Sequence, residues 1–130
     1  MRGAFNRKIL RGDRVTAPME VTVAHNGAAA TVVVAGELDL SSADRLRDAL
    51  RGEVDAGRPV LVDLRSCTFI DSVGLSVLIQ AAQRGRTLAI VSPSAAVRRL
   101  LELARLESLI PVFDSEAEAG ALAASQASAE

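Results

Sequence analysis

Aromatic residues are nearly absent from this sequence, which has three Phe and neither Trp nor Tyr among its 130 residues. A core must therefore be built from Val, Leu, Ile and Ala, as is ordinary for a compact α/β domain. Cysteine is equally scarce. Cys67 stands alone, so no disulfide can form within the chain, and we expect Cys67 to be a small buried hydrophobic residue.

Neither charge sign is in excess, because the chain has 15 Lys and Arg and 16 Asp and Glu, for a formal net charge of -1. Such a chain offers no positive field to a phosphate backbone, so we expect no nucleic-acid partner. No run approaches the roughly 18 apolar residues that would span a bilayer, so we expect no membrane span. These absences together favour a cytoplasmic protein.

Groups that could carry catalysis are few. The elbow motif of serine hydrolases, Gly-x-Ser-x-Gly, would need glycine where Ile70 stands, and the single histidine, His25, falls in a predicted turn far from Ser72. Lys8 is the only lysine and lies near the N-terminus, which argues against a receiver-type phosphoacceptor, and no Gly-x-x-x-x-Gly-Lys loop occurs. We therefore expect a protein that is not an enzyme and that has no cofactor or metal of its own.

The length is that of one domain with short extensions. Residues 1–18 carry five Lys and Arg but no continuous apolar stretch, so they do not form a secretory signal. We expect them to be a flexible basic arm, unless translation starts at Met19. Residues 19–122 should form the domain, and residues 123–130, rich in Ala and Ser, a disordered tail.

The first half of the domain predicts two strands, a helix and a third strand. Residues 20–24 alternate apolar with polar side chains, His25-Asn26-Gly27 supplies a turn, and residues 31–35 are largely β-branched, which predicts a hairpin. Ser41-x-x-Asp44 offers a capping box for a helix that Gly57 ends. The nearly all-apolar residues 59–64 predict a central strand covered by helices.

In the second half of the domain, helices again alternate with strands. Residues 65–71 should connect to a second helix from Ser72 to Arg84, with Gly85 at its C-cap. The remaining elements are a strand over residues 87–91, a helix that begins at Ser92-Pro93, a strand over residues 109–113 and a final helix capped by Ser115-x-x-Glu118. The order is ββαβαβαβα, which predicts a single α/β domain with a mixed, mostly parallel sheet and helices packed against it.

Two segments should meet at the carboxyl ends of the strands, which is where functional residues usually lie in a parallel sheet. Asp39 follows the second strand and Ser72 follows the third. If those strands are neighbours, Asp39 and Ser72 face the same corner. Taken alone, Ser72 is interpreted as a plain helix N-cap worth about 1 kcal/mol.

The same segments carry a resemblance to a known family, the STAS domains shared by sulphate transporters and anti-sigma factor antagonists. The matching runs are Gly36-Glu37-Leu38-Asp39-Leu40, Val60-Leu61-Val62-Asp63-Leu64, Phe69-Ile70-Asp71-Ser72-Val73-Gly74-Leu75, and Ser92-Pro93 ahead of Val97-Arg98-Arg99-Leu100-Leu101. Each run alone is common, but four in this order are specific. The resemblance covers residues 19–119.

The resemblance implies an anti-sigma factor antagonist that works by partner switching. Its partner would be an anti-sigma factor that is also a serine kinase, and phosphorylation of Ser72 would release that partner. The ATP and Mg²⁺ would belong to the kinase. The residues implied in partner binding are Asp39, Leu40, Asp71, Ser72, Val73, Gly74 and Leu75. The sequence leaves the oligomeric state open between a monomer and a weak dimer.

Two departures from the antagonist pattern keep a second interpretation open. Position 73 is Val, where phosphorylated relatives often carry Ser or Thr, and Gly85 comes only ten positions after Leu75, so the helix is about a turn short. The alternative is a STAS docking or regulatory subunit of a transporter or lipid-transport assembly, without a phosphoswitch.

Overall fold

The computed structural model describes residues 19–84 and 87–120. The predicted basic arm at residues 1–18, the tail at residues 123–130 and the C-cap at Gly85 lie outside the described residues.

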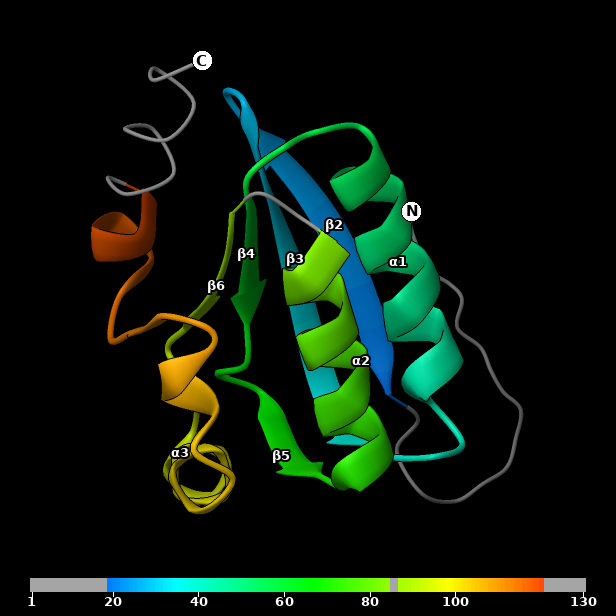
Figure 1. Cartoon of the computed structure of the whole chain (residues 1–130), viewed down its shortest axis with the longest axis vertical. Coiled ribbons are helices and arrows are strands. Elements are labelled where there is room, and N and C mark those ends of the chain that lie inside the picture. The colour runs from blue at the N-terminus through cyan, green and yellow to red at the C-terminus, as the bar shows by residue number, and fades with distance from the viewer. Residues whose placement is uncertain (1–18, 85–86, 121–130) are drawn as a thin grey trace.

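A six-stranded mixed sheet forms the centre of the molecule (Figure 1). Its strands are β2 (Glu20–Asn26), β3 (Ala29–Leu38), β4 (Val60–Asp63), β5 (Cys67–Ile70), β6 (Leu88–Val91) and β7 (Val112–Phe113). The order is β2-β3-β4-β6-β7, and β5 pairs with the far end of β3. Only the β2–β3 pair is antiparallel, which confirms the predicted mixed and mostly parallel sheet.

Helices cover the sheet on both faces. They are α1 (Ala43–Asp55), α2 (Ser72–Arg84), α3 (Ala95–Leu103), the 3-10 helix η2 (Leu106–Ser108) and a helix that the structure describes over residues 116–120. In Figure 1, α1 and α2 stand side by side in front of β2 and β3. The α2 helix spans the predicted residues, and α1 ends, as predicted, just before Gly57, whose φ is +80°.

Two aliphatic clusters fill the space on either side of the sheet. Val60 and Val62 of β4 pack into the large core beneath α1 and α2, whereas Leu61, between them, packs with Ala119 on the other side. This alternation follows from the two-residue period of a strand. The helix of residues 116–120 therefore lies on the face of the sheet opposite α1 and α2.

The β2–β3 hairpin turns later in the chain than predicted. Asn26 pairs with Ala29, and His25 lies within β2, so the turn consists of Gly27 and Ala28 rather than His25-Asn26-Gly27. Gly27 has a φ of +65°, which glycine adopts without strain and which suits a two-residue hairpin loop.

The β5 strand is a correction to the predicted order, because residues 65–71 were expected to be a connection. Three of its four residues pair in parallel with the end of β3, and Thr68 lies at a register shift between Gly36, where φ is +103°, and Glu37. Cys67 and Ile70 are buried, while the two residues between them are exposed. A segment this short has no two-residue period, so its sequence does not mark it as a strand.

Both predicted serine caps are displaced. Ser42, not Ser41, precedes α1, and its hydroxyl donates to the Glu37 carbonyl at 2.8 Å instead of capping the helix. Ser94, not Ser92, caps α3 by accepting from the Val97 N–H at 3.3 Å. Before α1, the N–H groups of Ser42 and Ala43 donate to the Asp39 carbonyl in a turn, so that helix begins one residue later. Before α3, the Ser92 N–H and hydroxyl donate to the carbonyls of Phe113 and Asp114, so that helix begins two residues later.

The last strand is shorter than predicted. β7 contains two residues instead of five, because the chain ahead of it forms η2. Leu109 is 61% exposed and Ile110 is buried, so the apolar run that predicted a strand includes a residue facing solvent. The predicted cap of the final helix is confirmed, since Ser115 Oγ accepts from the Glu118 N–H at 3.2 Å.

Candidate functional site

The carboxyl ends of β3 and β5 lie next to each other and form one corner of the sheet. Leu38 is in register with Ile70, and the Asp71 N–H donates to the Leu38 carbonyl at 3.1 Å. Residue 39 and residue 71 are therefore the first residues after two paired strands. The segments of Asp39 and Ser72 thus meet at one corner, as predicted, but they do so through β5 and not through the predicted third strand of residues 59–64.

The Asp71 carboxylate holds this corner together. Its Oδ1 accepts from the Gly74 N–H at 2.9 Å, and its Oδ2 accepts from the Leu40 N–H at 3.1 Å. The first contact caps α2, because Gly74 is the third residue of the helix. Asp71, rather than Ser72, is thus the N-cap, and the interpretation of Ser72 as a plain cap is wrong.

Ser72 is the first residue of α2, and it is exposed. Its carbonyl accepts from Ser76 Oγ at 3.0 Å, but no hydrogen bond joins its own hydroxyl to the described residues. Because Asp71 supplies the cap, the Ser72 hydroxyl is left facing solvent at a helix N-terminus.

Asp39 organises the neighbouring loop. Its Oδ1 accepts from the Ser41 N–H at 3.0 Å and from Ser41 Oγ at 2.7 Å. The hydroxyl of Ser41 contributes most to holding the pKa of Asp39 below its ordinary value. Asp39 therefore keeps its negative charge at the corner.

Apolar side chains flank the exposed serine. Leu40 is 75% exposed, Phe69 is 43% exposed, and Val73 and Leu75 are half-buried. Phe69 was not among the residues predicted for this surface. Two features of the sequence could have identified it: Phe69 is one of three aromatic residues, and it lies three positions before Ser72.

Gly74 contributes to the corner from beneath. It is buried, and a Cβ at this position would lie 2.7 Å from Leu38 Cγ and 3.0 Å from the Leu38 carbonyl oxygen. Only a glycine lets α2 approach the end of β3 this closely. Of the seven residues predicted for partner binding, Gly74 thus offers no side-chain surface.

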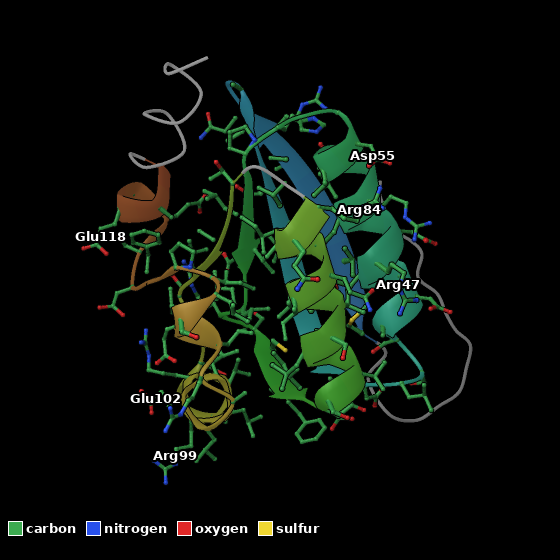
Figure 2. The ribbon with its side chains drawn as sticks, viewed as in Figure 1. Arg47, Asp55, Arg84, Arg99, Glu102 and Glu118 are labelled. Carbon is green, nitrogen blue, oxygen red and sulfur yellow. The ribbon has the colours of Figure 1, made fainter. Side chains whose placement is uncertain are left out.

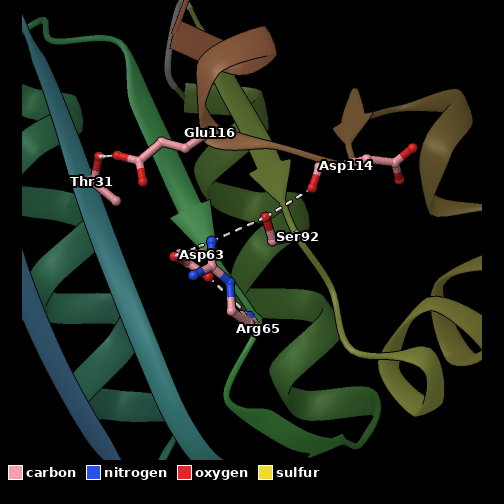
Figure 3. Close-up of polar contacts among 6 residues, drawn as sticks. All are labelled: Thr31, Asp63, Arg65, Ser92, Asp114 and Glu116. Carbon is pink, nitrogen blue, oxygen red and sulfur yellow. Dashed lines mark hydrogen bonds and ion pairs between the residues drawn. The ribbon is translucent and has the colours of Figure 1, made fainter.

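A second polar cluster lies at the carboxyl ends of β4 and β6 (Figure 3). The buried Asp63 accepts from the Arg65 N–H at 2.9 Å, and Ser92 Oγ donates to the Asp114 carbonyl at 3.0 Å. The Arg65 guanidinium donates to Ser92 Oγ at 3.4 Å, which links the two loops. These groups satisfy one another, so the cluster fastens loops rather than presenting free groups to a ligand.

Metal-ligating side chains do not gather in the described part of the chain, where no three His, Cys, Asp or Glu are placed to hold an ion. Among the helices of residues 19–84 and 87–120, none is both long and apolar enough to cross a bilayer.

Comparisons with known proteins agree with this geometry. The family model described as "Mlab, STAS domain" matches residues 21–111. An anti-sigma-F factor antagonist, RsfB of Mycobacterium tuberculosis, is 32% identical over 100 residues, which cover 73% of this chain and 81% of that protein. An anti-sigma-B factor antagonist of Listeria monocytogenes is 32% identical over 92 residues, which cover 67% of this chain and 81% of that protein.

A solved structure shares the fold over nearly its whole length. The crystal structure of an anti-sigma factor antagonist from Mycobacterium paratuberculosis superposes with a TM-score of 0.77 at 25% sequence identity, covering 84% of this chain and 98% of that chain. The matched region of the family model contains both the loop of Asp39 and the start of α2.

Proposed function

The chain belongs to the STAS domain family, and from this premise we propose that it is a cytoplasmic anti-sigma factor antagonist whose affinity for its partner is controlled by phosphorylation of Ser72. The partner is an anti-sigma factor that is also a serine kinase. The unphosphorylated chain binds this kinase and releases a sigma factor.

One observation carries the proposal: the Ser72 hydroxyl is exposed at the first position of α2, while Asp71 caps the helix in its place. A serine that caps a helix would have to give up a stabilising bond before it could be modified. Ser72 gives up none among the described residues. A kinase can therefore reach the hydroxyl while the fold stays intact.

Phosphorylation would disturb an interface far more than it would disturb the fold. The phosphate adds a charge of about -1.5 to -2, which a helix N-terminus tolerates because its N–H groups and dipole favour anions. A docked partner would instead have to strip water from that charge next to the carboxylates of Asp71 and Asp39. A hundredfold loss of affinity requires only about 2.7 kcal/mol.

The names of the relatives support this class of partner, since both are antagonists of an anti-sigma factor. One is named for sigma F and the other for sigma B. The exposed side chains of Leu40 and Phe69 supply apolar contact area beside the serine. We propose that these two residues join Asp39, Asp71, Ser72, Val73 and Leu75 in the docking surface.

Phosphorylation is tested by incubating the full chain with its cognate anti-sigma factor and ATP, then locating the modified residue by tandem mass spectrometry. We expect one phosphoryl group on Ser72 and none on the Ser72→Ala variant. Ser76, which is exposed on the same helix, serves as the internal control site. If Ser72 stays unmodified, the phosphoswitch is wrong, and the alternative of a docking subunit without phosphorylation is favoured. Val73 and the 13-residue length of α2 are the features that point to this alternative.

The affinity of Ser72 variants for the same partner shows whether charge repulsion or the loss of a side-chain contact weakens binding. Ser72→Ala should bind at least as tightly as the unmodified chain, and Ser72→Asp should bind roughly tenfold or more weakly, because it places an unpaired charge at the interface. Ser108→Asp, the same substitution at an exposed serine of η2 whose hydroxyl donates to the Arg105 carbonyl, is the control and should bind normally. Equal binding by the Ala and Asp variants of Ser72 would refute the electrostatic mechanism.

A further inference from the structure

The near-zero net charge of the chain results from two parts of the sequence that have opposite charges. Residues 1–18, the basic arm, carry five Lys and Arg and one Asp, for a formal charge of +4. Residues 19–130 carry 10 Lys and Arg and 15 Asp and Glu, for a formal charge of -5. Phe5, Ile9 and Leu10 lie among the basic residues of the arm. The arm therefore combines positive charge with large apolar side chains.

The arm joins the folded domain at the end of the sheet that contains the corner of Ser72. Met19, the first described residue, is 3% exposed and packs into the core. Glu20 is in register with Ala35, which is three residues, or about 10 Å, before the end of β3 at Leu38. In Figure 1, β2 begins at the lower end of the sheet, where α2 also begins. The attachment point of the arm is thus fixed beside this corner.

The corner is acidic, and its carboxylates have no cationic partner in the part of the chain that the structure describes. Glu37, Asp39 and Asp71 lie at the ends of β3 and β5, and none of the ion pairs among the described residues includes them. Asp39 and Asp71 accept hydrogen bonds there from neutral N–H and hydroxyl groups. Leu40 and Phe69 expose apolar surface beside them. In charge and in apolar character, the corner is the complement of the arm.

The length of the arm is sufficient to reach the corner. Residues 5–11 contain Phe5 and three of the five basic residues, and seven residues separate this segment from Met19. A link of seven residues spans about 15 Å on average as a random coil and about 24 Å when extended. Such a link holds the segment near the corner at an effective concentration on the order of millimolar. Contacts that would be too weak to hold a separate peptide are therefore sufficient for docking.

We propose that residues 5–11 dock on the corner of Ser72 and compete with the protein partner for it. The basic side chains of the segment pair with the carboxylates of the corner, and Phe5 contacts the exposed Leu40 and Phe69. Phosphorylation of Ser72 adds a charge of about -1.5 to -2, so it strengthens docking of the arm while it weakens docking of the partner. The competition rests on the function proposed above, whereas docking of the arm does not.

A spin label on the arm tests the docking directly. A nitroxide is attached to the full chain through Ala4→Cys, while Cys67 is fully buried and should stay unlabelled. In NMR spectra at low ionic strength, we expect the amide signals of Leu40 and Val73 to lose most of their intensity relative to the reduced label. The signal of Gly27, in the turn at the opposite end of β2, should be unchanged. Absence of the loss at the corner, or an equal loss at Gly27, would overturn the proposal.

Charge substitutions show whether the carboxylates hold the arm. Glu37→Gln should reduce the loss of signal, because it removes one exposed negative charge from the corner. Glu102→Gln is the matched control and should leave the loss unchanged, since Figure 2 shows Glu102 on α3, pointing away from α1 and α2. Added salt should also reduce the loss in the unmodified chain, because exposed charges are screened. Equal signals in the two variants would overturn the assigned contact.

The competition is tested by the affinity of the full chain for its anti-sigma factor. Replacing Arg7, Lys8 and Arg11 together by Gln should raise this affinity roughly threefold or more, because the arm then leaves the corner free. Arg99→Gln, on exposed α3, is the control and should bind normally. An unchanged or lower affinity in the triple variant would overturn the competition. Phosphorylation of Ser72 is measured separately, so a failure of the proposed function is distinguishable from a failure of the arm to dock.

Discussion

The Asp71 carboxylate accepts a hydrogen bond from the backbone N–H of Leu40 at 3.1 Å, although 31 positions of sequence separate the two residues. The other oxygen of the same carboxylate caps α2 through Gly74. One side chain thus fixes the loop after β3 relative to the start of the helix that contains Ser72. Any partner that contacts both segments depends on this carboxylate to hold them in position.

Asp71→Ala should lower the free energy of unfolding by about 1–3 kcal/mol, because it removes the N-cap of α2 and leaves the Leu40 N–H without its acceptor. Urea denaturation measures the change. Asp48→Ala, at an exposed position of α1, is the control and should stay within about 0.5 kcal/mol of the unmodified chain. Equal stability of the two variants would contradict the structural role of Asp71.

Gly74→Ala should destabilise the protein by about 1–3 kcal/mol, because the added methyl group would overlap Leu38. Gly52→Ala is the matched substitution within α1, where a Cβ would meet nothing within 4 Å. It should instead stabilise the protein by about 0.5–1 kcal/mol through helix propensity. Thermal or urea unfolding of both variants tests whether the free energy of unfolding falls in Gly74→Ala and rises in Gly52→Ala.

Cys67 should resist thiol reagents in the folded protein. The residue is fully buried, and this burial raises the pKa of the thiol, which disfavours the reactive thiolate. With Ellman's reagent near pH 8 we expect slow reaction that becomes fast in urea, and Ser72→Cys should add one rapidly reacting thiol. Rapid reaction of the native protein would show that Cys67 is accessible.

The raised pKa of Cys67 also has a consequence for stability. The native state holds the thiol proton more tightly than the unfolded state does, so the stabilising contribution is complete below the ordinary thiol pKa of about 8.5. As pH rises from there toward the raised value, the free energy of unfolding should fall. A Cys67→Ala variant should lack this part of the pH dependence.

Asp39 should titrate at a lower pH than an ordinary aspartate, because the hydroxyl and the N–H of Ser41 donate to its carboxylate. The contribution of these bonds is present above the ordinary aspartate pKa of about 3.9 and is lost as pH falls through the depressed value. Carboxyl carbon chemical shifts in NMR report this midpoint. Ser41→Ala should move it upward, and an unchanged midpoint would contradict the assigned cause.

The local sequence pattern was sufficient to predict an element where that element is long or where one residue type restricts the backbone. The bounds of α2, the end of α1 before Gly57 and the mostly parallel sheet were all predicted correctly, because helical and strand periodicities are properties of neighbouring residues. The meeting of the Asp39 and Ser72 segments was also predicted, since parallel strands end at a common edge, although the strand that brings them together is β5 and not the predicted third strand.

Other features depend on partners that are distant in the sequence. The β5 strand exists because the end of β3 offers it hydrogen bonds, and four residues are too few to show a period. The exposed hydroxyl of Ser72 depends on which of two adjacent residues caps α2, and the contact from Leu40 helps to hold Asp71 in that role. Arg47 and Arg51 of α1 line one groove together with Arg84 of α2. Only the packing of α1 against α2 brings these charges together, because sequence periodicity describes one helix at a time.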